Sequence, residues 1–268
     1  MRARTTLLAI SLLALPMLGS CELNKSELDV RKISRSVAYS LPVFHLNQLP
    51  MDEHISTNAF NLFIGSLDPA RSYFLQSDID GFREDSKSLH KRLRKGDIDF
   101  ALKVFDVLME RIENRTAFAE EQLAKGFDIE TSEVFLWDRK DAPWPKDEAE
   151  WDNLWRKRLK NEYVARLVSK EVYADEETNT VSVASSNVVA EAETATTNLV
   201  AETDGEYDEA AETANLSPEE FIQERYTQFK LTMESFDEEM LLQRYLSSFS
   251  QVYDPHSDYM SPSSVEDF

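Results

Sequence analysis

The sequence predicts an all-α fold, and three observations support this prediction. Apolar residues recur at intervals of three and four along most of the chain, which is the period of a helix with one buried face. Only six of the 268 residues are glycine, fewer than sheet-rich or dinucleotide-binding folds usually use for their turns. Hydrophobic residues make up 42%, enough to bury a core. We therefore expect a multi-helix domain, interrupted by one acidic insertion.

The first predicted helices follow one another closely. They cover residues 26–46, 52–67, 78–95 and 97–125. Asp68-Pro69 ends the second helix, because proline disfavours helical geometry in the residue before it. Gly96 stops the third, and Asp97 is placed to cap the fourth, which ends before Gly126.

A tryptophan-rich stretch at 138–171 predicts a further helix. Prolines on both sides of Trp144 make its entry rigid, and an acid-rich first turn follows. One helical face then collects the large apolar residues Trp151, Leu154, Trp155, Leu159, Tyr163 and Leu167. This pattern favours packing against a core over a ligand-stacking site.

Two capping boxes predict the last helices. Ser217 is followed by a proline and by Glu220, and Ser235 is followed three residues later by Glu238. The second helix ends at Asp254. The end of this helix resembles the end of the helix predicted over 52–67. "DPARSYF" at 68–74 and "DPHSDYM" at 254–260 share the same pattern, and both follow a predicted helix. We interpret both as helix-stop turns whose tyrosine returns to the core.

Residues 1–21 have the layout of a bacterial secretory signal. Two arginines precede an apolar run of nine residues, which is too short to span a hydrocarbon core of roughly 30 Å. Leu18-Gly19-Ser20-Cys21 then resembles a lipobox, whose cysteine receives a diacylglyceryl group and becomes the new N-terminus. The sequence predicts a lipoprotein with Cys21 as its lipid attachment site; the alternatives are an ordinary cleaved signal or an incidental cysteine. Glu22 after the cysteine favours the outer membrane.

Charge is distributed unevenly along the chain. The formal net charge is −21, and residues 174–214 contain eleven Asp or Glu and no Lys or Arg. This segment cannot bury enough apolar surface to offset its ordering entropy, so we predict a disordered acidic linker. The net charge argues against nucleic acid as a partner and against adhesion to anionic lipid through a basic face.

The residues offer little for catalysis or ligand binding. His256, Ser257 and Asp258 are consecutive, whereas a triad needs the serine and the carboxylate on opposite nitrogens of one imidazole. "QSDIDGFREDSK" at 76–87 lacks the acidic ligands at both ends of a calcium loop. The single cysteine excludes an intramolecular disulfide and a cysteine-based zinc site. The sequence predicts no catalytic, metal or cofactor site.

Three stretches together point to a family: "DPARSYFLQSDIDGF", "DRKDAPWPKDEAEWDNLW" and "DPHSDYMSPSSVEDF". They resemble the N-terminal region of the tail-specific proteases, also called carboxy-terminal processing peptidases, peptidase family S41. The resemblance extends over about residues 30–173 and 217–268. The acidic segment between them departs from the family pattern, but loop closure costs only about 0.6 kcal/mol per doubling of loop length, so one domain can tolerate it.

The resemblance implies an architecture and a location. The family joins a helical N-terminal domain to a PDZ domain and to a peptidase domain with a Ser–Lys dyad. It acts in the bacterial periplasm on proteins with apolar C-termini, which the PDZ domain captures. This chain ends where the PDZ domain would begin, so no catalytic residue can be transferred to it. We expect no peptidase activity from this chain alone.

The expected organisation is a lipoprotein signal at 1–21, a helical domain in two parts at 22–173 and 215–268, and the acidic linker at 174–214. Its role would be substrate handling and scaffolding for a tail-specific protease, with PDZ and peptidase domains in cis or on a separate chain. Two alternatives stay open: a stand-alone helical envelope lipoprotein acting as an adaptor, and a purely structural lipoprotein.

Overall fold

The computed structural model describes residues 29–178 and 216–266, and these ranges contain helices, turns and loops without a strand. The helices are α1 (Val30–Phe44), α2 (Glu53–Leu67), α3 (Gln76–Arg83), α4 (Leu89–Lys95), α5 (Asp99–Lys125), α6 (Glu148–Thr178), α9 (Pro218–Glu234), α10 (Glu238–Tyr253) and α11 (Pro262–Glu266). The predicted all-α fold is confirmed.

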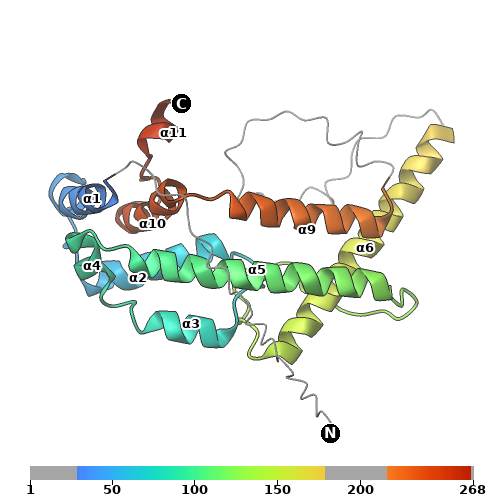
Figure 1. Cartoon of the computed structure of the whole chain (residues 1–268). Coiled ribbons are helices and arrows are strands. Elements are labelled where there is room, and N and C mark those ends of the chain that lie inside the picture. The colour runs from blue at the N-terminus through green and yellow to red at the C-terminus, as the bar shows by residue number, and fades with distance from the viewer. Residues whose placement is uncertain (1–28, 179–215, 267–268) are drawn as a thin grey trace, which may run out of the picture.

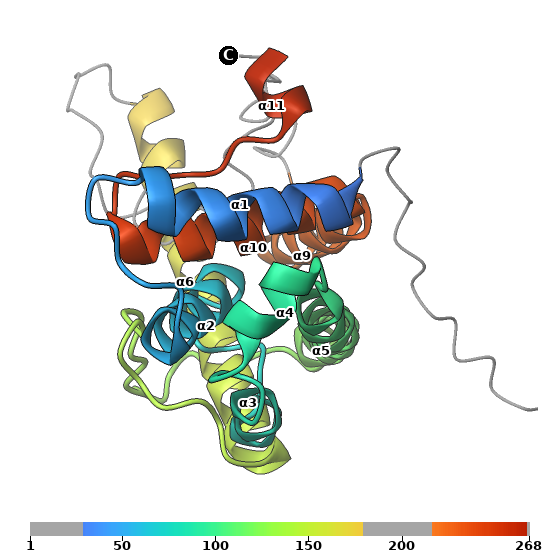
Figure 2. The same ribbon diagram turned by 90° about the vertical axis from the view of Figure 1, so that its left-hand side faces the viewer.

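Two long helices form the axis of the molecule. Figure 1 shows α5 and α9 side by side, with α6 crossing them at one end. At the other end α10 packs against α2, and α1 packs against α4 and α10. Figure 2 looks onto this end and shows α1 and α10 as a layer above α2, α4 and α5. The helices that follow the acidic segment therefore pack on helices that precede it.

Helix α2 agrees with the predicted 52–67, whereas α1 is shorter than the predicted 26–46. Asp29 caps α1 by accepting the N–H of Lys32 at 2.9 Å, and Asp52 caps α2 through the N–H groups of His54 and Ile55. Asp68 ends α2 as predicted. Phe44, which the periodicity assigns to the apolar face of α1, is instead 75% exposed.

The single helix predicted over 78–95 is wrong, because a turn at 84–88 divides it into α3 and α4. In this turn, Ser86 Oγ donates to the carbonyl of Arg83 at 2.7 Å, and Ser88 Oγ donates to that of Asp85 at 3.1 Å. Short hydroxyl side chains compete for backbone groups in this way. The turn lets Phe82 and Leu89 both enter the core.

Gly96 stops α4 as predicted, but the predicted Asp97 cap is wrong: Ile98 occupies the N-cap position of α5 and its side chain makes no capping hydrogen bond. Gly96 adopts a left-handed conformation, with φ of 75°, and its N–H bonds to the last carbonyls of α4. Asp97 accepts the N–H of Asp99 at 2.9 Å at the start of α5.

The C-terminal helices need one correction. The capping box of Ser217 and Glu220 is present, with reciprocal hydrogen bonds of 3.1 and 2.8 Å. The second predicted box is wrong: Ser235 closes α9, and Asp237 caps α10 by accepting the N–H of Met240 at 2.8 Å. The short α11 was not predicted.

Helix α6 extends to Thr178, so the first five residues of the predicted linker, 174–178, are helical instead. The predicted disorder at 179–214 lies outside the described residues. So do the signal segment at 1–21 and the proposed lipid attachment site, Cys21.

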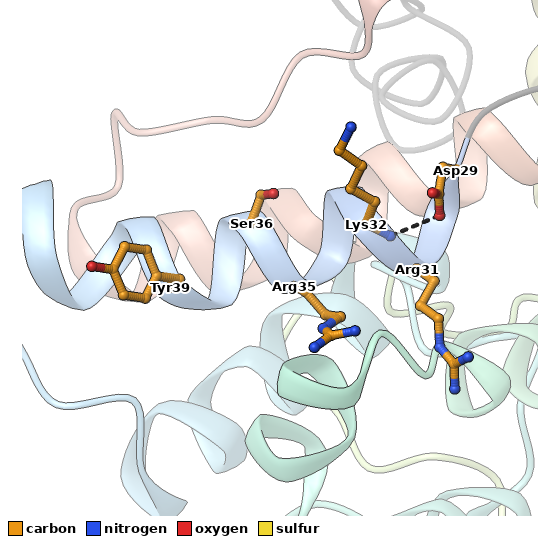
Figure 3. A pocket seen from close by; sticks show the side chains of 6 residues that line it. All are labelled: Asp29, Arg31, Lys32, Arg35, Ser36 and Tyr39. Carbon is orange, nitrogen blue, oxygen red and sulfur yellow. Dashed lines mark hydrogen bonds between the residues drawn. The ribbon is translucent and has the colours of Figure 1, made fainter.

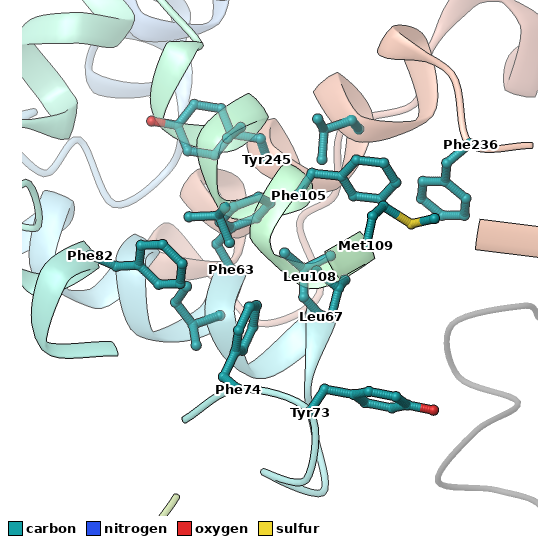
Figure 4. Close-up of a cluster of buried hydrophobic side chains, with 14 of the residues drawn as sticks. Phe63, Leu67, Tyr73, Phe74, Phe82, Phe105, Leu108, Met109, Phe236 and Tyr245 are labelled. Carbon is teal, nitrogen blue, oxygen red and sulfur yellow. The ribbon is translucent and has the colours of Figure 1, made fainter. Parts of the chain in front are cut away.

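One aromatic core holds the helices together (Figure 4). Phe63 of α2 lies 5.1 Å from Tyr245 of α10 and 6.2 Å from Phe100 of α5, between ring centroids. Such pairs are stabilising beyond their area burial, by about 0.5–1.5 kcal/mol each. Across residues 29–178 and 216–266, no helix has the length and apolar content that crossing a membrane requires.

Candidate functional site

The turn after α10 is bonded to the end of α1. Tyr253 OH donates to the carbonyl of Leu49 at 3.0 Å, and the Asn47 amide donates to the carbonyl of Tyr253. The ring of His45 lies 5.3 Å from that of Tyr253, and its Nε2 lies 3.1 Å from Ser257 Oγ. Residues far apart in the sequence therefore form one rigid corner.

This corner does not have the geometry of a catalytic dyad. His45 Nδ1 accepts the N–H of Asn47 at 3.2 Å, so Nδ1 is unprotonated and Nε2 carries the proton. Nε2 therefore donates to Ser257 Oγ, whereas a general base would have to accept from it. His256 and Asp258 are both exposed, and the Asp258 carboxylate accepts the N–H of Tyr259 at 2.8 Å. The interpretation of this stretch as a turn is supported.

An exposed apolar surface lies on the same corner. It consists of Tyr39, Val43, Phe44, Leu46 and Leu49, whose exposed fractions run from 37% for Leu49 to 93% for Leu46. The rings of Tyr39 and Phe44 meet edge to face at 6.4 Å. Soluble proteins seldom leave such a cluster uncovered, and clusters of this kind mark interaction sites. We call these five residues the apolar surface.

A second constellation is buried and centres on Asp68, which is 1% exposed. Its carboxylate accepts the N–H groups of Ser72, Tyr73 and Phe74 at 2.8–3.1 Å, and Trp144 Nε1 at 3.2 Å. Burial raises the pKa of the Asp68 carboxyl, while these donors act against that shift by stabilising its charged form. All four donors belong to the protein, so this carboxylate ties a turn together.

The turn that Asp68 holds also receives α6. Ser72 presents its carbonyl to Trp151 Nε1 and Trp155 Nε1, each at 2.7 Å. Arg158 donates to Ser72 Oγ at 3.1 Å. Trp151 and Trp155 are buried, as the predicted packing requires, and their indole N–H groups fix where α6 lies.

A carboxylate joins α6 to α9. Glu162 accepts from Arg158 Nε at 3.1 Å and from Tyr226 OH at 3.0 Å, and it forms an ion pair with Arg225. Burial raises the pKa of Tyr226 to about 12, so its phenol stays protonated and donates. This network was not predicted, because residues 158–162 and 225–226 are separated by the acidic segment and no local pattern pairs them.

The stretch at 76–87 folds into α3 and the following turn. Asp78 forms a bidentate pair with Arg111, at 2.8 and 2.9 Å, and Asp80 accepts from Gln76. In the part of the chain that the structure describes, no group of three or more His, Cys, Asp or Glu side chains could hold a metal ion.

Comparison with known proteins shows which protein family contains the residues described above. The family model described as the tail-specific protease N-terminal domain matches residues 37–263, which include the Asp68 turn, the tryptophans of α6 and the corner at Ser257. The chain belongs to this family. The tail-specific protease of Haemophilus influenzae is 25% identical to it over 225 residues. The alignment covers 84% of this chain and 26% of that relative. This tail-specific protease N-terminal domain thus spans about a quarter of the relative's length, and the predicted resemblance is confirmed.

Proposed function

We propose that this chain is the substrate-handling and scaffold part of a tail-specific protease of the bacterial envelope. In this proposal, PDZ and Ser–Lys peptidase domains, in cis or on a separate chain, capture and cleave proteins with apolar C-termini. The helices hold those domains in place, and the chain contributes no catalytic group.

The observation that carries the proposal is the apolar surface beside the C-terminal turn. In the family, the chain continues from this stretch into the PDZ domain. The corner formed by His45, Asn47 and Tyr253 fixes the apolar surface against the segment from which the next domain would emerge. Exposed apolar side chains at such a junction are suited to cover the face of a neighbouring domain.

Co-purification tests the scaffold role. The chain is expressed with the PDZ and peptidase domains encoded in the same genome, and association and cleavage of an apolar-tailed protein are measured. The double substitution Phe44→Glu and Leu46→Glu should weaken association at least tenfold, because it places two charges in the apolar surface. Val134→Glu, at an 85% exposed position elsewhere, should have no effect. Equal association of all variants would refute the proposed surface.

The proposed tether has its own test. Mass spectrometry of the protein extracted from its native host should show a diacylglyceryl group on Cys21, with residues 1–20 removed. A mature chain that lacks Cys21 would refute the lipid anchor and leave the scaffold role untouched. The coding sequence beyond Phe268 shows whether the PDZ and peptidase domains lie in cis.

A further inference from the structure

A basic surface lies at the N-terminal end of α1. Six exposed cations form it: Arg31, Lys32 and Arg35 of α1, and Lys91, Arg94 and Lys95 of α4. Figure 3 shows the open groove along α1, where Arg31 and Arg35 project toward α4 and Lys32 projects to the other side. The acid that lines this groove, Asp29, caps the helix.

Close packing of the two helices places the start of α1 next to the end of α4. Arg31 Nε donates to the carbonyl of Lys95 at 3.4 Å, and the backbone of Arg31 lies directly against Gly96. Neither α1 nor α4 contains an Asp or Glu. Throughout residues 29–178 and 216–266, none of the six cations has a partner in an ion pair, whereas Arg92 is paired with Asp85 and Asp97. No direct ion pair therefore neutralises these six cations in the described ranges, although Asp29 lines the same groove and Asp97 follows α4.

This concentration of charge is opposite to that of the chain, whose net charge is −21. Unpaired like charges repel one another, so a cluster of them suits an anionic partner. The match to the family begins at residue 37 and so leaves Arg31, Lys32 and Arg35 outside it.

The position of the basic surface identifies the partner. Eight peptide steps separate Cys21 from Asp29, and eight steps can reach at most about 29 Å. A lipid on Cys21 would therefore keep the start of α1 close to a bilayer. Tethering of this kind raises the effective concentration of a weak contact into the millimolar range for short linkers.

We propose that the basic surface docks on the anionic phospholipid headgroups of the membrane that holds the lipid anchor, which fixes how the domain stands on that membrane. The inference rests on the lipid anchor of the proposed function. It revises the expectation that the net charge argues against contact between a basic face and anionic lipid. The electric field of a membrane decays within a Debye length, about 8–10 Å at ordinary ionic strength, so the charge of the part nearest the membrane decides whether it is attracted. Nucleic acid is a weaker candidate, since nothing tethers it against the repulsion of the whole chain.

Vesicle binding of full chains carrying Cys21→Ala tests the surface without the lipid. The patch triple is Lys32→Gln, Arg35→Gln and Lys95→Gln, three cations whose side chains form no hydrogen bond or ion pair within the described ranges. The control triple, Lys125→Gln, Lys140→Gln and Lys146→Gln, changes the net charge equally on other parts of the surface. Residues 1–20 are identical in all three proteins, so they contribute equally to binding.

On vesicles with 30% phosphatidylglycerol, the patch triple should bind on the order of 100-fold more weakly than the parent chain, because each cation near the surface contributes roughly fivefold. The control triple should stay within about twofold of the parent, and 0.5 M salt should remove the difference between parent and patch triple. An unchanged thermal unfolding midpoint shows that the patch triple folds like the parent. If the patch triple does not fold, the double variant Lys91→Gln with Lys95→Gln is measured in its place.

Four results would overturn the proposal. Equal weakening of both triples would show an effect of net charge alone. Displacement of the parent by millimolar inorganic phosphate, or equal affinity for a 20-nucleotide DNA, would show a general anion site. Binding of the patch triple like the parent would show that the surface has no role. None of these depends on whether Cys21 is lipidated, which mass spectrometry decides separately.

Discussion

At the residue scale, the two Asp-Pro turns show how burial changes the role of one motif. Asp68 is 1% exposed and accepts four N–H groups, whereas Asp254 is partly exposed and its side chain accepts only the N–H of His256, at 2.8 Å, among the described residues. Tyr73 is buried, as predicted for both turns, while Tyr259 is only partly buried against the core. The same sequence pattern therefore forms a buried turn with four side-chain hydrogen bonds at 68–74 and a partly exposed turn at 254–260.

Asp68→Ala should destabilise the fold far more than Asp254→Ala. The first leaves four donors without an acceptor, and each unsatisfied buried group costs about 1–3 kcal/mol, so we expect a loss on the order of 3 kcal/mol or more. The second removes one partly exposed hydrogen bond within a turn and should cost about 1 kcal/mol. Urea unfolding measures both. Equal losses would contradict the role assigned to Asp68.

Gly96 is a second position where one atom matters. Its φ of 75° is unfavourable for other residues, and an added Cβ would lie 2.5 Å from the carbonyl oxygen of Arg31 and 2.8 Å from its Cα. Gly96→Ala should therefore cost about 2 kcal/mol or more in the free energy of unfolding. Gly65→Ala is the matched control: nothing lies within 4 Å of its added Cβ, and alanine in a helix should be stabilising by about 0.5–1 kcal/mol. A neutral Gly96→Ala would show that α1 is not packed on α4 as described.

At the element scale, the periodicity of apolar residues was sufficient to find α1, α2, α5, α6, α9 and α10, because each turns apolar residues toward the core at helical spacing. The periodicity missed a helix break where the buried residues on the two sides of the break keep helical spacing. Phe82 and Leu89 lie seven residues apart, two helical turns, and both are buried, so the pattern runs unbroken across the turn at Ser86. Ser235, which closes α9, was also interpreted as the cap of α10, two residues before the actual cap, Asp237.

The loop between α5 and α6 illustrates an element held by charge. Glu133 accepts from Arg156 at 2.6 and 2.9 Å and from Lys160 at 3.0 Å, and Lys160 also donates to the carbonyl of Thr131. These hydrogen bonds to cations lower the pKa of Glu133 to about 2. The loop has few buried side chains, so these contacts from α6 position it.

A lowered carboxyl pKa gives the sign of the pH dependence. The contribution of Glu133 is present above its ordinary pKa of 4.5 and is lost as the pH falls through about 2. A carboxyl titration by NMR should show a midpoint near pH 2 for Glu133. At pH 7, Glu133→Gln should speed amide exchange over residues 128–137, and Glu121→Gln, in an exposed pair with Lys125, should not. Unchanged exchange in Glu133→Gln would mean that other contacts hold the loop.

At the scale of the whole molecule, sequence patterns predict two helical parts separated by an acidic segment, but they do not show how the two parts meet. The meeting depends on long-range pairs such as Glu162 with Tyr226, and Tyr73 stacked on Phe229 at 5.6 Å. Helices α9 and α10 fill the space beside α5 and α2. Local sequence patterns also do not predict the basic surface or the apolar surface. Helix α4 completes the basic surface, and the turn at Tyr253 holds the apolar surface in place.

Because these contacts are extensive, continuity of the acidic segment should not be needed to keep the two parts together. A site for a sequence-specific protease inserted between Ala195 and Thr196 allows one cut. The nicked protein should elute as one particle, and its two fragments should separate only in denaturant. Nicking together with Glu162→Ala should lower the denaturant midpoint, because it leaves Arg158, Arg225 and Tyr226 without their shared, partly buried carboxylate. Glu224→Ala, at an exposed position of α9, is the control and should behave like the nicked parent. Fragments that separate in buffer would show that α9 and α10 need the covalent link to stay on α5 and α2.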